Sequence, residues 1–381
     1  MQQNNYQLLC NEPIPELNPI DGWMDVEINP IKSPLIPIGI FTKYNNIFTS
    51  SIYIAEHSNS PYGGSSKLSG SLLSTFMRED VAKKLQVAQK LLPKGHYLVV
   101  FDAYRTLEVQ ASLYNHYYTK LMQLYPKWDD IALSIETQKY VSLPSSDTSK
   151  PSPHHTGGAV DVAIVRVNDH VRIRLDQIDA RLDVLGYRSL DINTIEQYAK
   201  KSNYQEYYLL TLERSALLKN NAQMLNFGTE FDNGTKLAAL RYYENLAIIR
   251  SLNSEESEAA TNRRILYHAM VEAGMVPYQE EWWHFNAPES QMGAKVAGLK
   301  LATYGAVELT YANLEFENIR KLQKQAIKMI ANIYNGINTY GTADGVFNCI
   351  RALNEKAIKN GLQEPDKISL SDAAIIEPQL Y

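Results

Sequence analysis

The spacing of apolar residues in the first half of the chain predicts helices alternating with strands. Apolar side chains between residues 77 and 92 recur every three or four positions, as on one face of a helix, and Pro93 ends the pattern. Residues 97–101 form a short run of β-branched and aromatic side chains, which is typical of a buried strand. A second helix is expected at residues 107–117. Arg105 therefore stands just after a buried strand.

Three further runs predict strands, at residues 51–54, 159–164 and 281–285. The second run follows a loop rich in Pro, Ser, Asp and Thr and a tight glycine turn, and it contains Asp161. A helix is expected at residues 262–274, shortly before the third run.

The remaining pattern is mainly helical and suggests how the chain is divided. Residues 1–40 indicate an irregular N-terminal arm that carries one short strand. Residues 168–223 are charged and helical in character, and we interpret them as an insertion within a domain spanning residues 41–289. Residues 290–381 are expected to form a helical C-terminal extension, with an amphipathic helix beginning near Leu314.

Composition and charge narrow the class of protein. The 381 residues are 45% hydrophobic and 21% charged, as in an ordinary globular protein. A formal net charge of −5 argues against a nucleic-acid binder, and no run of about 18 apolar residues indicates a membrane span. Residues 1–11 lack the basic start and apolar centre of a secretory signal, so we expect a cytoplasmic protein, or a periplasmic one if a leader has been removed.

The chain has two cysteines, Cys10 and Cys349, too few for a disulfide scaffold or a thiolate metal site. A metal site must therefore use histidine and carboxylate side chains. Most of the eight histidines stand alone in the sequence. Neighbours on an extended segment point opposite ways, so at most one of His154 and His155 is a ligand. His154 is the better candidate, because it lies beside a glycine turn shortly before Asp161.

Two segments are each open to two interpretations. A carboxylate on an apolar strand needs a cation or several donors, so Asp161 either binds a metal or pairs with an arginine or a turn. Glu281 and His284 are three positions apart and would face opposite sides of a strand, unless a bulge or a strand end brings them together. Alone, the segment containing Trp282 and Trp283 is also consistent with a core strand that carries one polar histidine.

Taken together, the two segments predict one catalytic zinc site. His154, Asp161 and His284 supply three ligands, and three protein ligands with an open fourth position are typical of catalytic zinc. Bound zinc lowers the pKa of its water toward about 7, and Glu281 would take the proton of that water as general base. Arg105 would stabilise the oxyanion of a tetrahedral intermediate, or else serve as a salt-bridged structural arginine.

The same residues resemble the motifs of the D-alanyl-D-alanine dipeptidase family of zinc peptidases. The matching motifs, in the family's order, are Asp102-Ala103-Tyr104-Arg105, Ser152-x-His154-x-x-Gly157-x-Ala159-x-Asp161, Gly228-Thr229-Glu230-Phe231-Asp232, Asn262-Arg263-Arg264-Ile265-Leu266 and Glu281-Trp282-Trp283-His284. Ala103 departs from the glycine of the family's D-G-Y-R motif. The resemblance covers residues 40–287 without the 168–223 segment, and it does not reach the C-terminal extension.

The resemblance implies an α+β fold of the zinc D,D-peptidase and hedgehog-like type, in which a mainly antiparallel central sheet is flanked by helices. It implies one Zn2+ per chain, held by His154, Asp161 and His284.

The resemblance also implies roles for four further residues. Glu281 would be the catalytic base, and Arg105 would stabilise the tetrahedral intermediate. Ser152 and Asp232 would hold the free ammonium group of a dipeptide substrate. A carboxylate placed to pair with that amine rejects longer chains, whose amine lies elsewhere.

Two other functions stay open beside hydrolysis of D-alanyl-D-alanine or a similar free dipeptide. A D,D-carboxypeptidase or peptidoglycan endopeptidase would share the zinc site, although Asp232 favours the dipeptidase. A non-catalytic zinc-containing binding protein would use the added helices for a partner, but structural zinc requires neither Glu281 nor Arg105. We expect a small dipeptide as ligand, no nucleic acid, and a candidate contact for a homo-oligomer in the helices after residue 290.

Overall fold

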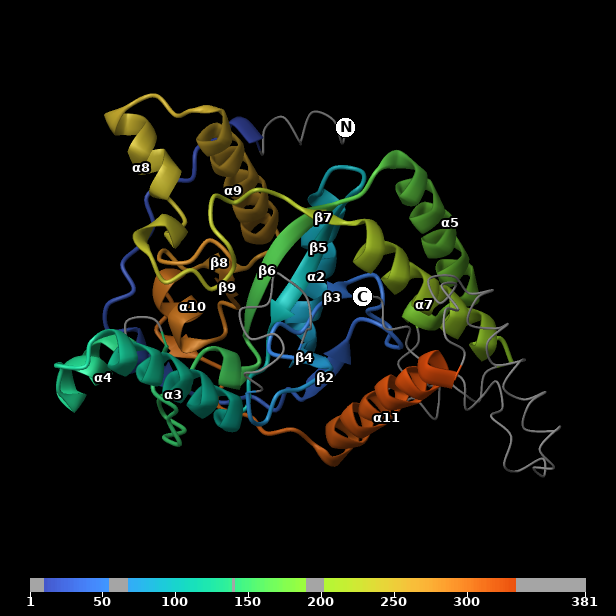
Figure 1. The fold of residues 1–381 in the computed structure, drawn as a ribbon, viewed down its shortest axis with the longest axis horizontal. Helices are drawn as coiled ribbons and strands as arrows, with labels where there is room; N and C mark the ends of the chain where they lie inside the picture. The colour runs from blue at the N-terminus through green and yellow to red at the C-terminus, as the bar shows by residue number, and fades with distance from the viewer. Residues whose placement is uncertain (1–9, 55–67, 139–140, 190–201, 334–381) are drawn as a thin grey trace.

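The computed structural model describes residues 10–54, 68–138, 141–189 and 202–333 of the chain (Figure 1). Within these ranges helices surround one central sheet, so the chain is an α+β protein, as predicted. The predicted C-terminal extension is described only to residue 333. Residues 334–381, with Cys349, lie outside the described part.

A mainly antiparallel sheet forms the centre of the described molecule. β3 runs parallel to β5, and the other pairs of this sheet are antiparallel. The long strands β5 and β6 are buried almost throughout, because apolar side chains occupy both of their faces. The strands lie in the order β3 (Phe48–Thr49), β5 (His96–Asp102), β6 (Ala159–Arg166), β9 (His284–Asn286) and β8 (Val276–Pro277), and β7 (Gln223–Met224) pairs with the C-terminal end of β6.

Two smaller sheets connect the N-terminal part to the rest of the chain. β2 (Leu35–Ile38) pairs antiparallel with β4 (Thr75–Arg78), and β1 (Glu27–Ile28) pairs in parallel with β10 (Leu301–Ala302). In its described residues, 10–40, the N-terminal arm carries the strands β1 and β2 and the 3-10 turn η1 (Trp23–Asp25), so the expectation of a single strand is wrong. Because β1 pairs with β10, the arm packs directly on the segment after residue 290.

Helices α2 (Glu79–Leu91) and α9 (Ser254–Glu272) contact each other and pack against the sheet. α2 buries the apolar face that contains Val81 and Leu85, which confirms the helix predicted from the spacing. α9 begins earlier than predicted, because Asn253 and Glu256 form a capping box that satisfies the first backbone N–H groups of the helix.

The other helices lie around this core (Figure 1). α3 (Leu107–Leu124) and α4 (Asp130–Gln138) form a hairpin at one end of the molecule, and α5 (Asp169–Leu185) packs against α7 (Tyr204–Asn221) at the opposite end. α5 and α7 confirm the helical character of the segment in its described parts, whereas residues 190–201 lie outside the described residues. The interpretation of residues 168–223 as an insertion stays a prediction. The elements not yet named are α8 (Tyr242–Ile249), α10 (Gln291–Val296), α11 (Tyr311–Ile333), η2 (His154–Thr156), η3 (Tyr187–Ser189) and η4 (Lys236–Ala238).

None of the helices in the described ranges combines the length and the apolar character that crossing a bilayer requires. α11 is the helix predicted to begin near Leu314, and its first turns contact β2.

The strand predicted at residues 51–54 is wrong, because this segment forms a turn. β3 comes just before it, and the backbone N–H groups of Ser50 and Ile52 still donate to carbonyl groups of β5. The apolar run does indicate burial, since Ile52 is fully buried. Its burial comes from packing in the core and not from membership of a strand.

The strand predicted at residues 281–285 begins only at His284. The backbone N–H of Trp282 donates to the carbonyl of Ala238, at 3.0 Å, and not to a neighbouring strand. Glu281 therefore lies ahead of the strand, in the segment that turns into it. This is the strand end that lets Glu281 and His284 approach each other.

Candidate metal centre and active site

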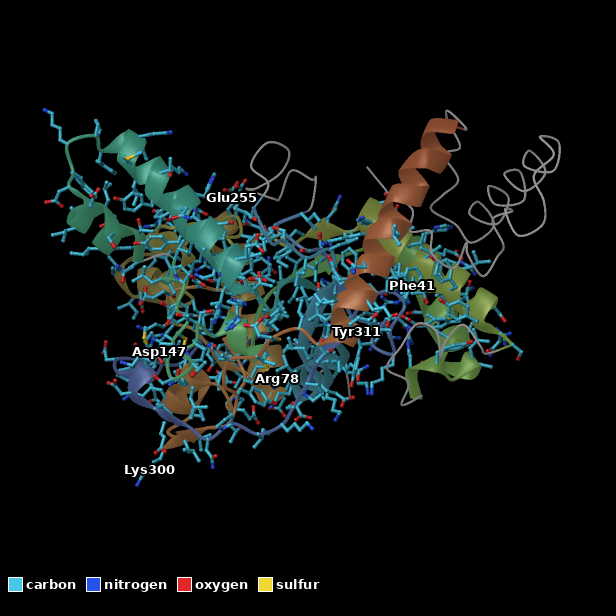
Figure 2. All side chains as sticks on the ribbon, turned by 90° about the horizontal axis from the view of Figure 1, so that it is seen from below. Phe41, Arg78, Asp147, Glu255, Lys300 and Tyr311 are labelled. Atoms are coloured by element: carbon cyan, nitrogen blue, oxygen red, sulfur yellow. The ribbon has the colours of Figure 1, made fainter. Side chains whose placement is uncertain are left out.

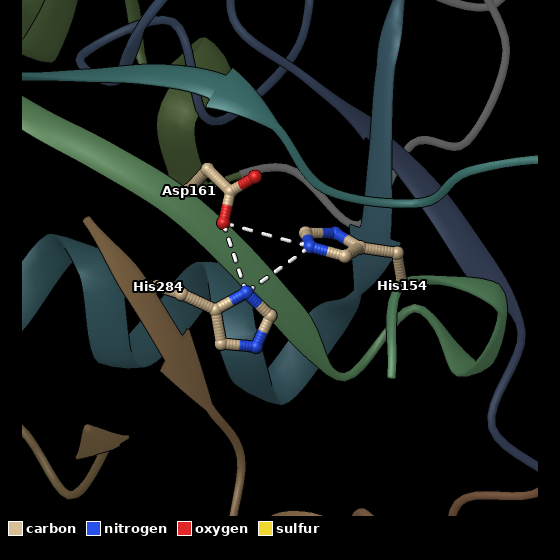
Figure 3. A group of neighbouring side chains, drawn as sticks. All are labelled: His154, Asp161 and His284. Carbon is tan, nitrogen blue, oxygen red and sulfur yellow. Dashed lines mark hydrogen bonds and ion pairs between the residues drawn. The ribbon is translucent and has the colours of Figure 1, made fainter. Parts of the chain in front are cut away.

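The side chains of His154, Asp161 and His284 meet in the interior of the protein (Figure 3). Oδ1 of Asp161 lies 3.0 Å from Nδ1 of His284 and 3.5 Å from Nε2 of His154. The two imidazole nitrogens are 3.2 Å apart. All three residues are buried. The structure therefore brings together the three residues that the sequence predicted as metal ligands.

Strand pairing and one turn position these side chains. β6 and β9 are antiparallel, and their register places Asp161 directly opposite His284. His154 comes from η2, which ends at Gly157 with a φ of 68°. A left-handed backbone favours glycine there, and an added Cβ would also lie 2.3 Å from a methyl group of Leu35. Gly157 thus turns the chain so that His154 returns over the start of β6.

The outer nitrogens of both imidazoles contact oxygen acceptors. Nδ1 of His154 lies 2.7 Å from the carbonyl oxygen of Ala103, and Nε2 of His284 lies 3.3 Å from Oδ1 of Asn286. In the neutral rings these nitrogens carry the proton, so the lone pairs of the inner nitrogens point toward Asp161. Three acceptor atoms this close together repel one another unless a cation or protons lie between them.

This donor set fits a divalent metal such as zinc. Two imidazoles and one carboxylate are ligands that zinc accepts, and three ligands leave a coordination position open. Without a metal, burial works to raise the pKa of the Asp161 carboxyl, but His154 and His284 in their protonated form hold this pKa well below its usual range. Asp161 is therefore ionised and offers a full negative charge to a cation.

Glu281 lies beside this centre. One of its carboxylate oxygens is 3.8 Å from Nδ1 of His284, and 27% of its side chain is exposed. Burial raises the pKa of Glu281 to about 8, with Asp161 and Asp232 adding to the rise and His284 opposing it. A carboxyl that binds a proton this readily and still reaches solvent is suited to accept and release protons.

Arg105 is salt-bridged and also lies close to the metal centre, and its role at an oxyanion stays a prediction. Its guanidinium group donates to Oδ2 of Asp102 at 2.5 and 2.8 Å and to Oε1 of Gln110 at 2.9 Å. A guanidinium nitrogen also lies 3.9 Å from Oδ2 of Asp161. Burial opposes the charge of Arg105, but Asp102 outweighs it and raises the pKa of Arg105 above its usual value. The group is thus a permanent, fixed cation.

Sequence reasoning missed the residues that hold Arg105 in place. The hydroxyl of Tyr53 donates to Asp102 at 2.9 Å, and the ring of Tyr53 lies 5.3 Å from the guanidinium carbon of Arg105. Asp102 belongs to the motif Asp102-Ala103-Tyr104-Arg105, but no role was predicted for it. Its position at the end of a buried strand, close to Arg105, could have indicated an ion pair. Tyr53 had no signal in the sequence, because it reaches Arg105 only through the fold. Gln110 stands close to Arg105 in the sequence, near the start of α3, but nothing in the pattern distinguished it from other polar helix residues.

The two residues predicted to bind the substrate amine, Ser152 and Asp232, lie in different surroundings. The side chain of Ser152 accepts a 3.3 Å hydrogen bond from the backbone N–H of His155, within the turn that carries His154. Asp232 is exposed and has a φ of 61°. Its charge contributes to the raised pKa values of Glu281 and Tyr53, which puts Asp232 on the same side of the protein as the site. Their binding of an ammonium group stays a prediction.

The loop that carries Asp232 is held by Arg263 of α9. The buried guanidinium of Arg263 donates to three carbonyl groups, of Phe227 at 2.9 Å, Leu237 at 2.7 Å and Ala239 at 2.6 Å. These carbonyls flank the loop on both sides, so one side chain ties its two ends together. A guanidinium, with donors spread over a planar fork, suits this task.

Trp282 supports the same loop. Its indole stacks on the ring of Phe227 at 4.1 Å, and its N–H donates to the hydroxyl of Thr229 at 2.8 Å. Trp282 is fully buried, so it packs behind the loop.

His155 is not part of the metal centre. Its Nδ1 lies 3.2 Å from the carbonyl oxygen of Arg105, and its Nε2 lies 3.4 Å from the carboxylate of Glu308. The choice of His154 over His155 as the candidate ligand therefore agrees with the geometry.

Comparisons with known proteins agree with the motifs. A family model described as D-ala-D-ala dipeptidase matches residues 210–300, a stretch that includes Asp232, Glu281 and His284. The D-alanyl-D-alanine dipeptidase of Synechocystis sp. is 23% identical to this chain, over 61% of the chain and 79% of the relative. The resemblance found in the sequence is thereby confirmed, because the chain is similar to D-alanyl-D-alanine dipeptidases over part of its length.

Proposed function

We propose that the protein is a zinc-dependent dipeptidase that hydrolyses D-alanyl-D-alanine or a similar free dipeptide. One observation carries this proposal. A carboxylate with a raised pKa and a permanent cation both lie close to the same three-acceptor centre, Glu281 at 3.8 Å from His284 and Arg105 at 3.9 Å from Asp161. A purely structural metal site needs neither group.

His154, Asp161 and His284 would hold the zinc ion. Zinc bound there supplies Lewis acidity, which polarises a peptide carbonyl and makes water acidic near neutral pH. The ligand contacts to Ala103 and Asn286 keep both imidazoles in the tautomer that this binding requires.

The side chains around the metal centre would transfer the proton and stabilise the negative charge of the intermediate. Glu281 takes a proton from the attacking water and later gives it to the nitrogen of the leaving amino acid, so no net proton is gained or lost by the enzyme. Arg105 faces the negative charge that develops on the carbonyl oxygen as the carbon becomes tetrahedral. Asp102 and Gln110 fix the guanidinium before substrate arrives, which removes the cost of reorganising it during the reaction.

Asp232 and Ser152 would select free dipeptides. An ammonium group paired with the Asp232 carboxylate sets the distance from the N-terminus to the bond that is cut. A substrate whose amine is blocked, or lies several residues away, loses this pairing. The support is the position of Asp232 on a loop that Arg263 and Trp282 hold beside Glu281.

A three-substrate assay tests the proposal. Zinc-loaded protein is given D-alanyl-D-alanine, N-acetyl-D-alanyl-D-alanine and a peptidoglycan stem pentapeptide, with the His284→Ala variant as the matched control. We expect hydrolysis of the free dipeptide alone, and none by the variant. Preferential release of the terminal D-alanine from the pentapeptide would favour a D,D-carboxypeptidase. Absence of turnover on all three, with zinc bound, would favour a binding protein.

A further inference from the structure

The buried carboxylate of Glu317 links α11, the last helix of the described residues, to one wall of a small cleft beside Arg105. Glu317 is 2% exposed. Its Oε1 accepts the backbone N–H of Leu73 at 2.8 Å, and its Oε2 accepts the backbone N–H of Ser74 at 2.9 Å. Lys321, one turn later on the helix, lies 3.2 Å from Oε1. Burying a carboxylate is costly unless donors replace its water, and these three groups do so.

Neighbouring residues of α11 hold the helix in the position that this contact needs. Asn313 donates from Nδ2 to the carbonyl oxygen of Leu35 at 3.0 Å. The ring of Phe316 meets Phe76 of β4 edge to face, with centroids 6.2 Å apart. Figure 2 shows α11 rising from Tyr311 beside the region of Phe41. The first turns of α11 are thus seated on the β2–β4 sheet, so that Glu317 faces the segment just before β4.

The segment that Glu317 holds borders the cleft at Arg105. Leu72, Ser74 and Thr75 line this cleft together with Asp102 and Arg105. Among the described residues, the buried hydroxyl of Ser74 has no hydrogen-bond partner. A polar group from substrate or a water entering the cleft can satisfy that hydroxyl.

Two more hydrogen bonds join this wall to the core. The hydroxyl of Ser51 donates to the carbonyl of Leu72 at 2.8 Å, and the backbone N–H of Tyr104 donates to the carbonyl of Phe76 at 2.8 Å. The start of the segment is therefore tied to Ser51, and the residue just after its end is tied to Tyr104, the neighbour of Arg105. Between these ties, the N–H groups of Leu73 and Ser74 are held only from α11 among the contacts within the described residues.

We propose that Glu317 is a positioning residue for the dipeptidase reaction, which fixes the Leu72–Thr75 wall of the cleft at Arg105. The inference rests on the proposed function. It implies that the first turns of α11 hold the Leu72–Thr75 segment in place. The metal ligands and Glu281 do not touch Glu317, so its loss should change how substrate is held and leave zinc binding intact.

Hydrogen exchange tests the link without any activity. The Glu317→Gln variant keeps the size of the side chain, but its NH2 group faces a backbone N–H where a carboxylate oxygen had accepted. We expect faster exchange at the amides of Leu73 and Ser74 in this variant. The matched control is Glu315→Gln, which removes the same charge from an exposed position of the same helix. Unchanged exchange in Glu317→Gln overturns the inference.

Kinetics on zinc-loaded protein tests the role. We expect Glu317→Gln to raise KM for D-alanyl-D-alanine roughly tenfold, with kcat changed by less than about threefold and zinc content equal to that of the wild type. A merely structural defect would lower the fraction of active protein, which reduces kcat and leaves KM unchanged. That second pattern, or equal effects of Glu315→Gln and Glu317→Gln, contradicts the positioning role.

The two proposals fail in different ways. If the wild type hydrolyses no dipeptide, the proposed function fails, and the exchange experiment alone decides whether α11 holds the wall. If the wild type is active and Glu317→Gln exchanges and turns over normally, only the inference fails. Should circular dichroism show that Glu317→Gln does not fold, Glu317→Asp takes its place, because its shorter carboxylate keeps the charge but cannot reach both amides. The same outcomes then apply.

Discussion

Glu281 and its neighbour Glu280 are two adjacent carboxylates with different surroundings. Glu281 lies 3.8 Å from a candidate metal ligand and is partly buried, whereas Glu280 is exposed. The pair therefore provides a test and its control within one segment, because the same change of charge and size can be made at both positions.

We expect Glu281→Gln to lower kcat for D-alanyl-D-alanine by a factor of about 10² to 10⁴, the usual range for loss of a general base or acid. The amide keeps the shape of the side chain but cannot accept the proton. Zinc content, measured by atomic absorption, should stay that of the wild type, and Glu280→Gln should behave as the wild type. Full turnover by Glu281→Gln with zinc bound would remove Glu281 as the base.

The proposed role of Asp232 predicts how the enzyme selects dipeptides with a free amine. Asp232→Asn should lower kcat/KM for the free dipeptide roughly 10- to 100-fold, which corresponds to the loss of one charge-assisted hydrogen bond of about 1.5–3 kcal/mol. Turnover of the N-acetylated dipeptide should remain low in both proteins. Glu230→Gln, a change of the same charge at an exposed position in the same loop, is the control. If the wild type cleaves blocked and free dipeptides equally well, Asp232 is not the amine anchor.

At the scale of elements, α5 and α7 are joined by a cluster of charges around Asp179. One oxygen of Asp179 accepts hydrogen bonds from Arg188 and from Arg214, the latter at 2.9 Å. Burial works to raise the pKa of Asp179, but the two arginines outweigh it and lower that pKa below its usual value. Arg214 also donates to the carbonyl groups of Asn45 and Asn46, so the cluster ties this helix pair to the central part of the chain.

The lowered pKa has a defined consequence for stability. A carboxyl that is more acidic when folded stabilises the protein above its unfolded pKa of about 3.9 and loses this contribution as the pH falls through its folded pKa. We expect Asp179→Asn to reduce the free energy of unfolding by about 1–3 kcal/mol at pH 7, measured in urea. The gap to the wild type should close as the pH is lowered below 4.

Asp183→Asn is the control for this prediction. Asp183 also pairs with Arg188, at 2.9 Å, but its side chain is 66% exposed. Exposed pairs contribute at most about 1 kcal/mol, so this variant should lie close to the wild type at every pH. A gap for Asp179→Asn that does not depend on pH would mean that the loss comes from packing and not from charge.

At the scale of the whole molecule, the metal centre joins parts of the chain that are distant in sequence. His154 and Asp161 come from the middle of the chain and His284 from a strand far downstream. A cation bound by all three residues therefore links segments that are far apart in the sequence. It also offsets the repulsion among three buried acceptor atoms.

Removal of the metal should lower the thermal stability. Binding to the folded state alone contributes RT ln(1 + [L]/Kd), which is about 2.7 kcal/mol at a hundredfold excess over Kd. For a chain of this size that corresponds to a fall in Tm of several degrees on chelation, measured by differential scanning fluorimetry and reversed by added zinc. In His284→Ala the same chelator should leave Tm unchanged. Equal Tm values of the wild type with and without chelator would argue against a bound metal.

Part of the site was predictable because it consists of local signals. His154 and Asp161 lie on a turn and the strand that follows it, and the glycine turn between them could be recognised from the sequence. Arg105 and Glu281 stand at the ends of apolar runs, where side chains leave the core. The prediction of His284 as the third ligand joined two segments through their chemistry, and the β6–β9 register later placed it opposite Asp161.

The helices α2, α3, α9 and α11 and the buried strands β5 and β6 were determined by the sequence alone, because apolar spacing and turn residues act over a few positions. The tertiary structure decided the rest. Tyr53 reaches Asp102 and Arg105, Arg263 ties the Asp232 loop, and Glu317 holds the wall near Arg105 only because distant segments pack together. Such contacts depend on the pairing of elements across more than a hundred positions in some cases, and no local pattern of side chains encodes a partner that far away.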